Sequence, residues 1–541
     1  MIPSAEDLTN SGSGTCDYLA TSTTSSLLMP DFNADKMSGW TYSAWTNLYR
    51  CNYFLKNIDK AAATTDVATL NHYRGVAKWR AYFYFDKVKT YGNLPWYSEP
   101  IDAGDSIQLY KERDSREVIM DSVLQDINYA CKYIRGGKDE LVSRYAALAL
   151  KSRICLFEGT YRKYHAVNPS TNQPWQETDG ARKYLQACVD ASEELMNSGE
   201  YSLVNTGKPA TDYRSLFQSE KPNTTEIIMA REYSADLQST HNVTQKFNSA
   251  GNDTRRWSPT QDFVNTYLNL DGSRFTDATD YDKKTFAENC TNRDYRLQQS
   301  VITPTYIKNM NGTPSRYNAT WSVTMTGYHV IKFNMDDTYY EQTSRCSNAI
   351  PIFRYAEILL NEAEAKAELG EMDENVWDKT IRPIRERAGV NGKAPATADP
   401  YMISYYNNKV TDKWLLEIRR ERAIELFFEG GGLRYDDLMR WAEGDMLMKP
   451  WNSIYIGSKD VAYDTNGDGV KDLEVVDKKP SSTPSGVFLV DLSKSNYYTF
   501  KDGRLYITNE NSWTDRKYLH PIPKAALVKN PNLKQNYGWE Q

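Results

Sequence analysis

The sequence predicts a mainly α-helical protein, in which tetratricopeptide-like helical hairpins form a scaffold that carries large irregular loop insertions and a few short strands. Apolar residues recur at helical spacing in several blocks of the chain. Two distant segments, 144–159 and 354–370, repeat the same helical pattern. Elsewhere the chain is rich in Asn, Thr, Ser, Asp, Gly and Pro, which is typical of loops.

The first half of the chain contains several predicted helices. They cover residues 73–92, 115–134, 143–159 and 180–198. On the first of them, helical spacing places five residues on one face: Ala77, Ala81, Tyr84, Val88 and Tyr91. Ser115 is a typical helix start, and Gly199 is a typical stop.

The two similar segments predict repeated helical hairpins. Both begin Arg-Tyr-Ala, continue with Leu and Ala at helical spacing, and end in glycine. Each is followed by another predicted helix, at 180–198 and at 375–389. A helix pair of about 34 residues is the tetratricopeptide unit, so we expect an irregular version of that architecture.

We expect one domain over residues 1–541. Its helical scaffold lies mainly in 40–200 and 350–445, and a loop-rich lobe lies mainly in 201–349 and 446–520. Long irregular stretches in a compact protein usually carry function, so we expect the binding site in the lobe.

The segment 417–441, EIRRERAIELFFEGGGLRYDDLMRW, combines charged and apolar residues. Its apolar residues point all round the helix, which predicts burial. Buried charges must be paired, and Glu417 with Arg420 and Arg422 with Glu425 stand at the i, i+3 spacing. Three glycines (430–432) follow the helix and are expected to close it, whereas a phosphate loop places its glycines before a helix.

Composition excludes one class of partner. The chain has 65 Lys+Arg and 71 Asp+Glu, a formal net charge of −6, without the basic face of a nucleic-acid-binding protein. It also has 39 Tyr and 13 Trp, rings that fill cores and recur at binding surfaces.

The sequence does not decide the cellular compartment. No run of 18 apolar residues predicts a membrane-spanning helix. The N-terminus lacks the apolar region of a signal peptide, so we expect either a cytoplasmic protein or one whose leader has been removed. Seven cysteines show no metal-ligand spacing and no clear disulfide framework.

No catalytic motif is apparent. The five histidines lack metal-binding spacing, and no G-x-S-x-G elbow occurs. A pair of glycosidase carboxylates needs no sequence motif and stays open as an alternative.

One loop has the spacing of a calcium ligand set. In 464–472, DTNGDGVKD, positions 1, 3, 5 and 9 of an EF-hand-type loop are Asp464, Asn466, Asp468 and Asp472. Val475 replaces the glutamate at position 12, and helices do not flank the loop. We expect either a structural Ca²⁺ here or an ordinary solvated turn; no other cofactor is expected.

Several blocks together resemble the SusD/RagB family of Bacteroidetes. They are 45–59, 80–96, 143–159, 352–370, 381–390, 417–441 and 518–539, in the order of the family. The resemblance implies a non-enzymatic, surface-exposed, lipid-anchored protein of the outer membrane. It implies binding of oligosaccharides or polysaccharides and their delivery to a SusC-like TonB-dependent transporter. The lipid-bearing cysteine is not evident, because no apolar run precedes Cys16.

A non-catalytic sugar site needs flat rings and a few fixed hydrogen-bonding groups. Rings outside the regular helices are the candidates: Trp96, Trp257, Trp321 and Tyr328. Asn93 and Arg256 are the candidate hydrogen-bonding residues. Trp96 follows the family's Tyr-Gly-x-x-Pro turn, near which some members place a sugar-contacting aromatic.

Two other functions stay open at this point. A tetratricopeptide-like scaffold that binds a protein or peptide would use a groove on the helix pairs. A glycoside hydrolase on a helical fold would need two close carboxylates in an open cleft.

Overall fold

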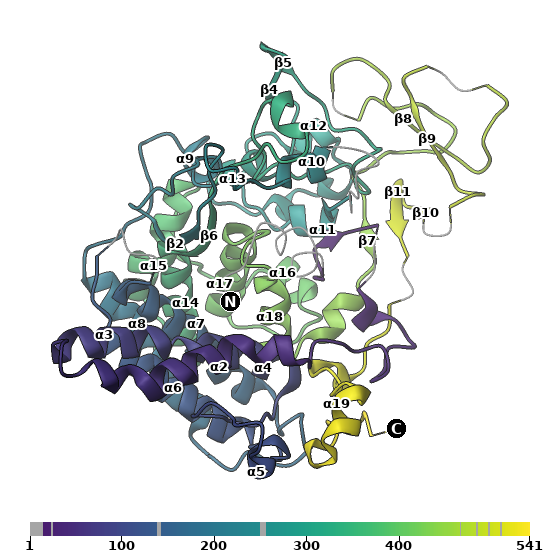
Figure 1. The fold of residues 1–541 in the computed structure, drawn as a ribbon. Coiled ribbons are helices and arrows are strands. Elements are labelled where there is room, and N and C mark those ends of the chain that lie inside the picture. Colours follow the sequence, from purple (N-terminus) through teal and green to yellow (C-terminus); the bar gives the residue numbers. More distant parts are fainter. Residues whose placement is uncertain are drawn as a thin grey trace.

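The computed structural model describes residues 15–22, 25–137, 142–248, 256–465, 467–482, 485–495, 498–508 and 511–540. Helices make up the lower part of the molecule in Figure 1, and short strands joined by long irregular segments make up the upper part. This is the mainly α-helical fold with a few short strands that the sequence predicts.

The helical part is built from longer helices that pack side by side. In chain order they are α2 (Tyr42–Asn57), α3 (Val67–Ala77), α4 (Arg80–Tyr91), α6 (Arg116–Tyr133), α7 (Arg144–Tyr164), α8 (Gly180–Asn197), α14 (Tyr355–Leu369), α15 (Glu374–Arg387), α17 (Lys413–Glu425) and α18 (Leu433–Arg440). α7 packs along α8, and α14 packs on α8, α15 and α17. The two similar sequence segments are therefore the first helices of two adjacent hairpins, α7–α8 and α14–α15.

The predicted ends of α6 and α8 are confirmed. Ser115 caps α6, because its Oγ accepts a hydrogen bond of 3.3 Å from the backbone N–H of Val118. Gly199 follows α8 with a φ of +67°, a conformation that glycine adopts at little cost.

The prediction of one helix over 73–92 is wrong, since the segment holds the end of α3 and the whole of α4. Around the break, backbone N–H groups bond three residues back instead of four, from Trp79 to Val76 and from Ala81 to Lys78. This tighter turn lets α3 and α4 each pack on α6. The predicted apolar face is nevertheless buried throughout, so its periodicity carried no sign of the break.

The upper part is held together by short strand pairs. They are β1 (Leu19–Ala20) with β3 (Ser258–Pro259), β2 (Ile227–Arg231) with β6 (Ile350–Arg354), β4 (Ile307–Met310) with β5 (Thr313–Arg316), β8 (Leu473–Val476) with β9 (Phe488–Asp491), and the sheet β10 (Tyr498–Lys501), β11 (Arg504–Ile507), β7 (Trp451–Asn452). β8 and β9 are parallel, and the other pairs are antiparallel. β6 runs directly into α14, so the β2–β6 pair connects the strands to the helices.

Short helices and turns fill the remaining segments. They include α5 (Ser106–Leu109), α9 (Asp212–Ser215), α10 (Val243–Asn248), α11 (Gln261–Val264), α12 (Phe286–Asn289), α13 (Tyr295–Ser300), α16 (Pro400–Tyr405), α19 (Lys524–Lys529), and the 3₁₀ turns η1 (Ser26–Leu28) and η4 (Tyr281–Lys283). The hydrophobic core of the upper part includes Ile424, Phe427 and Phe428 at the end of α17. The lobe is thus built onto a helix of the scaffold.

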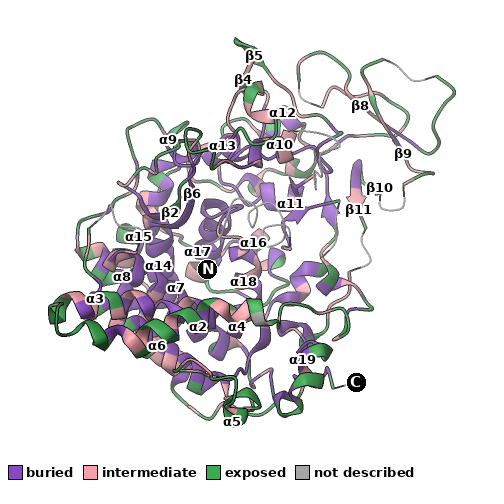
Figure 2. Cartoon of the chain, in the orientation of Figure 1, coloured by how far each residue is buried: buried purple, intermediate pink, exposed green. Residues whose placement is uncertain are grey.

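Helix α17 is buried, as predicted, with every residue from Leu416 to Glu425 inside the protein (Figure 2). The predicted pair of Glu417 with Arg420 forms at 2.7 Å. The predicted pair of Arg422 with Glu425 does not form. Arg422 points to α18 and binds Asp437 at 2.9 Å, whereas Glu425 faces arginines of other elements.

The three glycines do not close α17, which corrects the prediction. The helix ends at Glu425, and the first left-handed residue after it is Phe428, with a φ of +60°. Gly430, Gly431 and Gly432 come later, all with positive φ, and form the turn into α18.

Candidate functional site

Trp96 and Asn93 lie in the turn between α4 and α6, and both make structural contacts. The Asn93 Oδ1 accepts a 2.9 Å hydrogen bond from the backbone N–H of Arg116, at the start of α6. Asn93 is buried, so this side chain holds the turn rather than a ligand, which corrects its predicted role. The Trp96 ring is half-buried, 4.3 Å from the Tyr84 ring and 5.2 Å from the Arg80 guanidinium. Its role in sugar binding stays a prediction.

The other predicted rings lie in the interior. Trp257 and Trp321 are 3% exposed and Tyr328 is fully buried, all in the core of the lobe. Trp257 meets Phe247 and Phe428 edge-on, with centroids 5.5 and 5.6 Å away. A sugar cannot reach these rings, so their predicted role is corrected: they pack the lobe.

Arg256 also acts within the fold. Its Nη2 donates hydrogen bonds to the backbone oxygens of Trp321 (2.8 Å) and Thr324 (2.6 Å). The guanidinium thus ties two loop segments together, and its role in ligand binding stays a prediction.

The predicted calcium loop is folded around its own carboxylates. Asp464 Oδ1 accepts from the backbone N–H of Gly467 (2.6 Å), and Oδ2 accepts from that of Gly469 (2.7 Å). Asp468 Oδ2 accepts from Asn318 Nδ2 at 2.5 Å. Asp472 accepts hydrogen bonds from Thr465. Asn466 lies outside the described residues.

In the described part of the chain, no three His, Cys, Asp or Glu side chains are grouped so as to hold a metal ion. Burial raises the pKa of Asp472, and the negative charges of Asp464 and Asp468 raise it further. A cation in this loop would relieve that repulsion. Calcium binding stays a prediction.

The structure brings together four half-buried tyrosines that the sequence did not single out. We call them the tyrosine cluster: Tyr281, Tyr401, Tyr455 and Tyr506. They come from η4, α16, the segment after β7, and β11. The rings of Tyr281 and Tyr401 are 6.0 Å apart and nearly perpendicular.

Asp262 of α11 connects the members of this cluster. Its backbone oxygen accepts a 2.9 Å hydrogen bond from the Tyr401 hydroxyl. Its carboxylate accepts one of 2.9 Å from Asn452 Nδ2, and its backbone N–H donates back to Asn452 Oδ1 at 3.1 Å. Asn452 is the cross-strand neighbour of Tyr506 between β7 and β11. Residues far apart in the sequence are therefore held in one place.

Arg504 holds the other side of the cluster. Its guanidinium donates to the backbone oxygens of Ser453 (2.9 Å) and Asp282. The same group lies 5.6 Å from the centre of the Tyr455 ring. Arg504 thus fixes η4, which carries Tyr281, against the sheet that carries Tyr506.

Tyr281 and Tyr506 are neutral hydrogen-bonding groups at physiological pH. Burial raises the pKa of Tyr281, and the carboxylates of Asp282 and Asp262 raise it further. Burial and then the Asp262 carboxylate raise the pKa of Tyr506 in the same way. Within the described chain, neither hydroxyl has a hydrogen-bond partner. Flat rings with free hydroxyls beside a fixed carboxylate are the groups that a hydroxylated ligand can use.

One sequence signal could have found part of this cluster. In β11, Leu505 and Ile507 are buried in the core, while Tyr506 between them stays half-buried. This alternation of apolar and amphipathic residues predicts a strand with one face toward the solvent. The positions of Tyr281 and Tyr401 depend on tertiary contacts that no local pattern shows.

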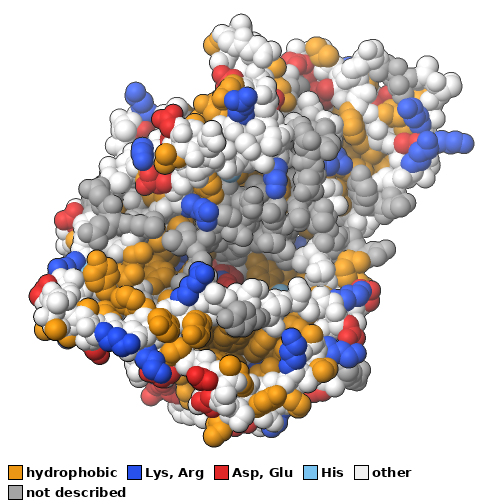
Figure 3. Space-filling view, in the orientation of Figure 1, with side chains coloured by type: hydrophobic (Ala, Val, Ile, Leu, Met, Phe, Trp, Pro, Cys, Tyr) orange, Lys and Arg blue, Asp and Glu red, His pale blue; other side chains and the backbone are white. Residues whose placement is uncertain are grey.

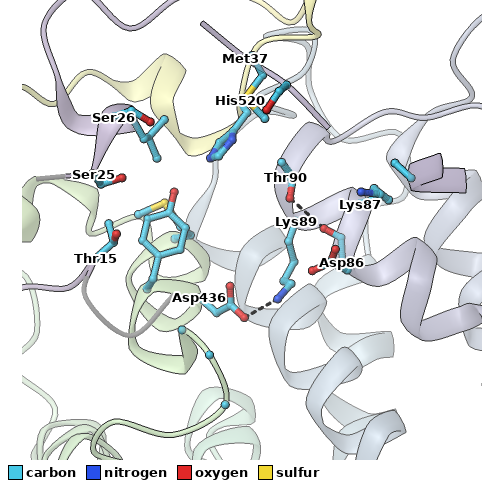
Figure 4. A pocket seen from close by; sticks show the side chains of 18 of the residues that line it. Thr15, Ser25, Ser26, Met37, Asp86, Lys87, Lys89, Thr90, Asp436 and His520 are labelled. Atoms are coloured by element: carbon cyan, nitrogen blue, oxygen red, sulfur yellow. Dashed lines mark hydrogen bonds and ion pairs between the residues drawn. The ribbon is translucent and has the colours of Figure 1, made fainter. Parts of the chain in front are cut away.

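A separate cavity of about 720 Å³ lies between the N-terminal segment, α4, α18 and the glycine turn (Figure 4). Ser25 and Ser26 approach it from the N-terminal segment, and Lys89 and Thr90 from α4. Gly430, Gly431 and Gly432 also line it, so the conspicuous segment 417–441 borders an open space.

Among the described helices, none is both long and apolar enough to cross a membrane.

Comparison with known proteins agrees with this architecture. The SusD_RagB family model, described as the SusD family, matches residues 225–539. The SusD-like protein P38 of Formosa agariphila is 26% identical over an alignment of 403 residues, and the match covers 69% of this chain and 67% of that protein.

Solved structures show the same fold. A SusD-like protein from Bacteroides fragilis has a TM-score of 0.67 at 21% identity, covering 99% of this chain and 94% of that one. A SusD-like carbohydrate binding protein, also from Bacteroides fragilis, has a TM-score of 0.63 at 20% identity, covering 94% of this chain and 88% of that one. The family match extends over more than half of the chain, and the chain belongs to the SusD/RagB family.

Proposed function

We propose that this protein binds an oligosaccharide or polysaccharide at the tyrosine cluster, without cleaving it, and passes it to a SusC-like TonB-dependent transporter at the cell surface. The family and the carbohydrate-binding relative support a glycan as the ligand. The observation that carries the proposal to this site is the tyrosine cluster, whose half-buried rings surround Asp262.

The chemistry of the cluster suits a neutral glycan. Sugar rings present C–H faces, which pack on aromatic rings, and hydroxyls, which exchange hydrogen bonds with neutral phenols. Tyr281 and Tyr506 supply an aromatic face and a phenol hydroxyl. Arg504 and Asp262 hold the elements that carry them in place before a ligand arrives. Such preorganisation reduces the entropy lost on binding.

Binding without cleavage fits the state of the central carboxylate. A glycosidase uses two carboxyl groups about 5–9.5 Å apart, which flank the glycosidic bond. The Asp262 carboxylate accepts a hydrogen bond from Asn452 and joins α11 to β7. We therefore expect no release of reducing ends from any bound glycan.

A second surface supports docking to the transporter. On α2 and α3, large apolar side chains are 41–54% exposed: Tyr49, Tyr53, Phe54 and Tyr73. The Tyr49 and Tyr53 rings stack with centroids 6.1 Å apart. Figure 3 shows hydrophobic side chains gathered over this region. Exposed apolar patches mark interaction surfaces, and aromatic residues are enriched in them.

The proposed cell-surface location would be secured by an N-terminal lipid anchor.

Affinity electrophoresis of the purified chain against a panel of neutral polysaccharides tests the proposal. We expect retardation by at least one glycan, with no reducing sugar released on long incubation. Retardation by none, together with capture of peptides on the helical part, would favour the peptide-binding scaffold. Released sugar would favour the hydrolase.

The proposed docking to the transporter needs a separate test. Replacing Tyr49, Tyr53 and Phe54 by Ser should abolish co-purification with a co-expressed SusC-like transporter and leave glycan retardation unchanged. Retained co-purification would assign the docking surface elsewhere.

A further inference from the structure

The cavity of about 720 Å³ beside α4 is separate from the tyrosine cluster and shares none of its residues. Its size is within the range of small-molecule sites, roughly 300–1,000 Å³. The N-terminal segment, α4, α18 and His520 surround it.

Aromatic rings form part of its walls. Tyr82 and Phe83 come from α4, and Tyr435 comes from α18. Tyr82 and Tyr435 are half-buried. Flat half-buried rings beside an open space give a hydroxylated ring a surface to lie against.

Polar groups surround the same space. Lys89 and Asp436 form an ion pair of 2.6 Å across it, with each side chain 21% exposed (Figure 4). Ser25, Ser26 and Thr90 add hydroxyls. These groups provide hydrogen-bond donors and acceptors in the lining of the cavity.

His520 also lines the cavity. Its Nδ1 is buried and has no hydrogen-bond partner within the described residues. Burial lowers the pKa of His520 to about 4, so the ring is neutral at physiological pH. The neutral ring therefore adds no charge to the wall of the cavity.

Two of the lysines that line the cavity have a carboxylate partner. Lys89 pairs with Asp436, and Lys36 pairs with Asp31. A charged ligand would leave one of these groups without compensation, whereas a neutral hydroxylated ligand would not.

We propose that this cavity is a second carbohydrate site, which takes one neutral sugar unit at the end of a chain or branch. The proposal rests on the proposed function only in assuming a carbohydrate ligand. An open tyrosine surface suits the middle of a chain, whereas a cavity bordered by several elements suits an end.

Saturation-transfer NMR tests the proposal on the whole chain, with D-glucose, D-galactose, D-mannose and D-xylose as neutral probes and D-glucuronate and D-glucosamine as charged ones. We expect binding of at least one neutral probe, and weaker binding of the charged ones. Asp436→Asn removes an acceptor and the ion pair, and Ser26→Trp puts a bulky ring at the exposed edge. Each substitution should weaken the binding of the neutral probe at least tenfold.

The double variant Tyr281→Ala/Tyr506→Ala is the matched control and should leave that binding unchanged. Melting temperatures show whether each variant is folded. Binding that survives both Asp436→Asn and Ser26→Trp, or no binding of any neutral probe, overturns the second site. Loss only in the tyrosine double variant also overturns it, while the proposed function stands.

Discussion

Arg354 and Glu425 form a fully buried ion pair, with 2.5 Å between Nη1 and Oε1 and side chains 1% and 0% exposed. Arg354 is the last residue of β6, and Glu425 is the last residue of α17. Glu425 also binds Arg387 and, at 3.0 Å, Arg296. The strand-rich lobe and the helical scaffold therefore meet at one carboxylate, whose pKa these arginines hold well below its usual range against the effect of burial.

Replacing Glu425 by Ala is expected to destabilise the protein by about 3–5 kcal/mol, because several buried arginines lose their partner. Chemical denaturation measures the change. Lys221→Ala, which breaks the exposed pair with Glu232, is the control and should change the stability by less than about 0.5 kcal/mol. Equal effects of the two substitutions would show that the buried network does not support the fold.

Buried histidines predict a loss of stability in mild acid. Burial lowers the pKa of His165, His241 and His329 to about 4. Between about pH 4 and 6.5 the unfolded chain binds protons that the folded chain does not, so stability falls as the pH drops through this window. Each histidine contributes a slope of about 1.4 kcal/mol per pH unit.

His329→Gln tests this effect at one position. The Nε2 of His329 lies 2.9 Å from the backbone oxygen of Phe247, and an amide N–H can donate there without titrating. We expect a shallower fall of the melting temperature from pH 6.5 to 5 than in the wild type. An identical pH profile would mean that His329 is not protonated on unfolding.

Chelation tests the predicted calcium. Removing bound Ca²⁺ from loop 464–472 would leave three carboxylates close together, one with an already raised pKa. EDTA is therefore expected to lower the melting temperature, and added Ca²⁺ to restore it. Asp464→Asn should abolish the response. A transition that EDTA leaves unchanged would identify the loop as a turn held by its own hydrogen bonds.

Helix faces were predictable because burial repeats along the sequence. Tyr84 and Val88 lie on the predicted apolar face of α4, and both are fully buried. The break before Arg80 was not predictable, because it changes a few backbone hydrogen bonds and leaves the apolar face intact. The burial of α17 was predictable, but the partner of Arg422 depended on where α18 packs.

The proposed binding residues were harder to predict for a physical reason. Trp257 stands among polar neighbours and Tyr506 between two apolar ones, yet Trp257 is 3% exposed and Tyr506 is half-buried. Which ring faces solvent is decided by the packing of distant segments, such as the hydrogen bonds that join Asp262 to Asn452. Composition indicated that rings would matter and could not say which ones.

Isothermal titration calorimetry with the glycan identified by affinity electrophoresis tests the central claim most directly. The compared proteins are the wild type, Tyr281→Ala/Tyr506→Ala, and Tyr110→Ala, whose exposed ring on another part of the surface is the control. We predict that the double variant binds at least tenfold more weakly, a loss of about 1.4 kcal/mol or more. Tyr110→Ala should bind like the wild type. Equal affinity of the double variant and the wild type would contradict glycan binding at the tyrosine cluster.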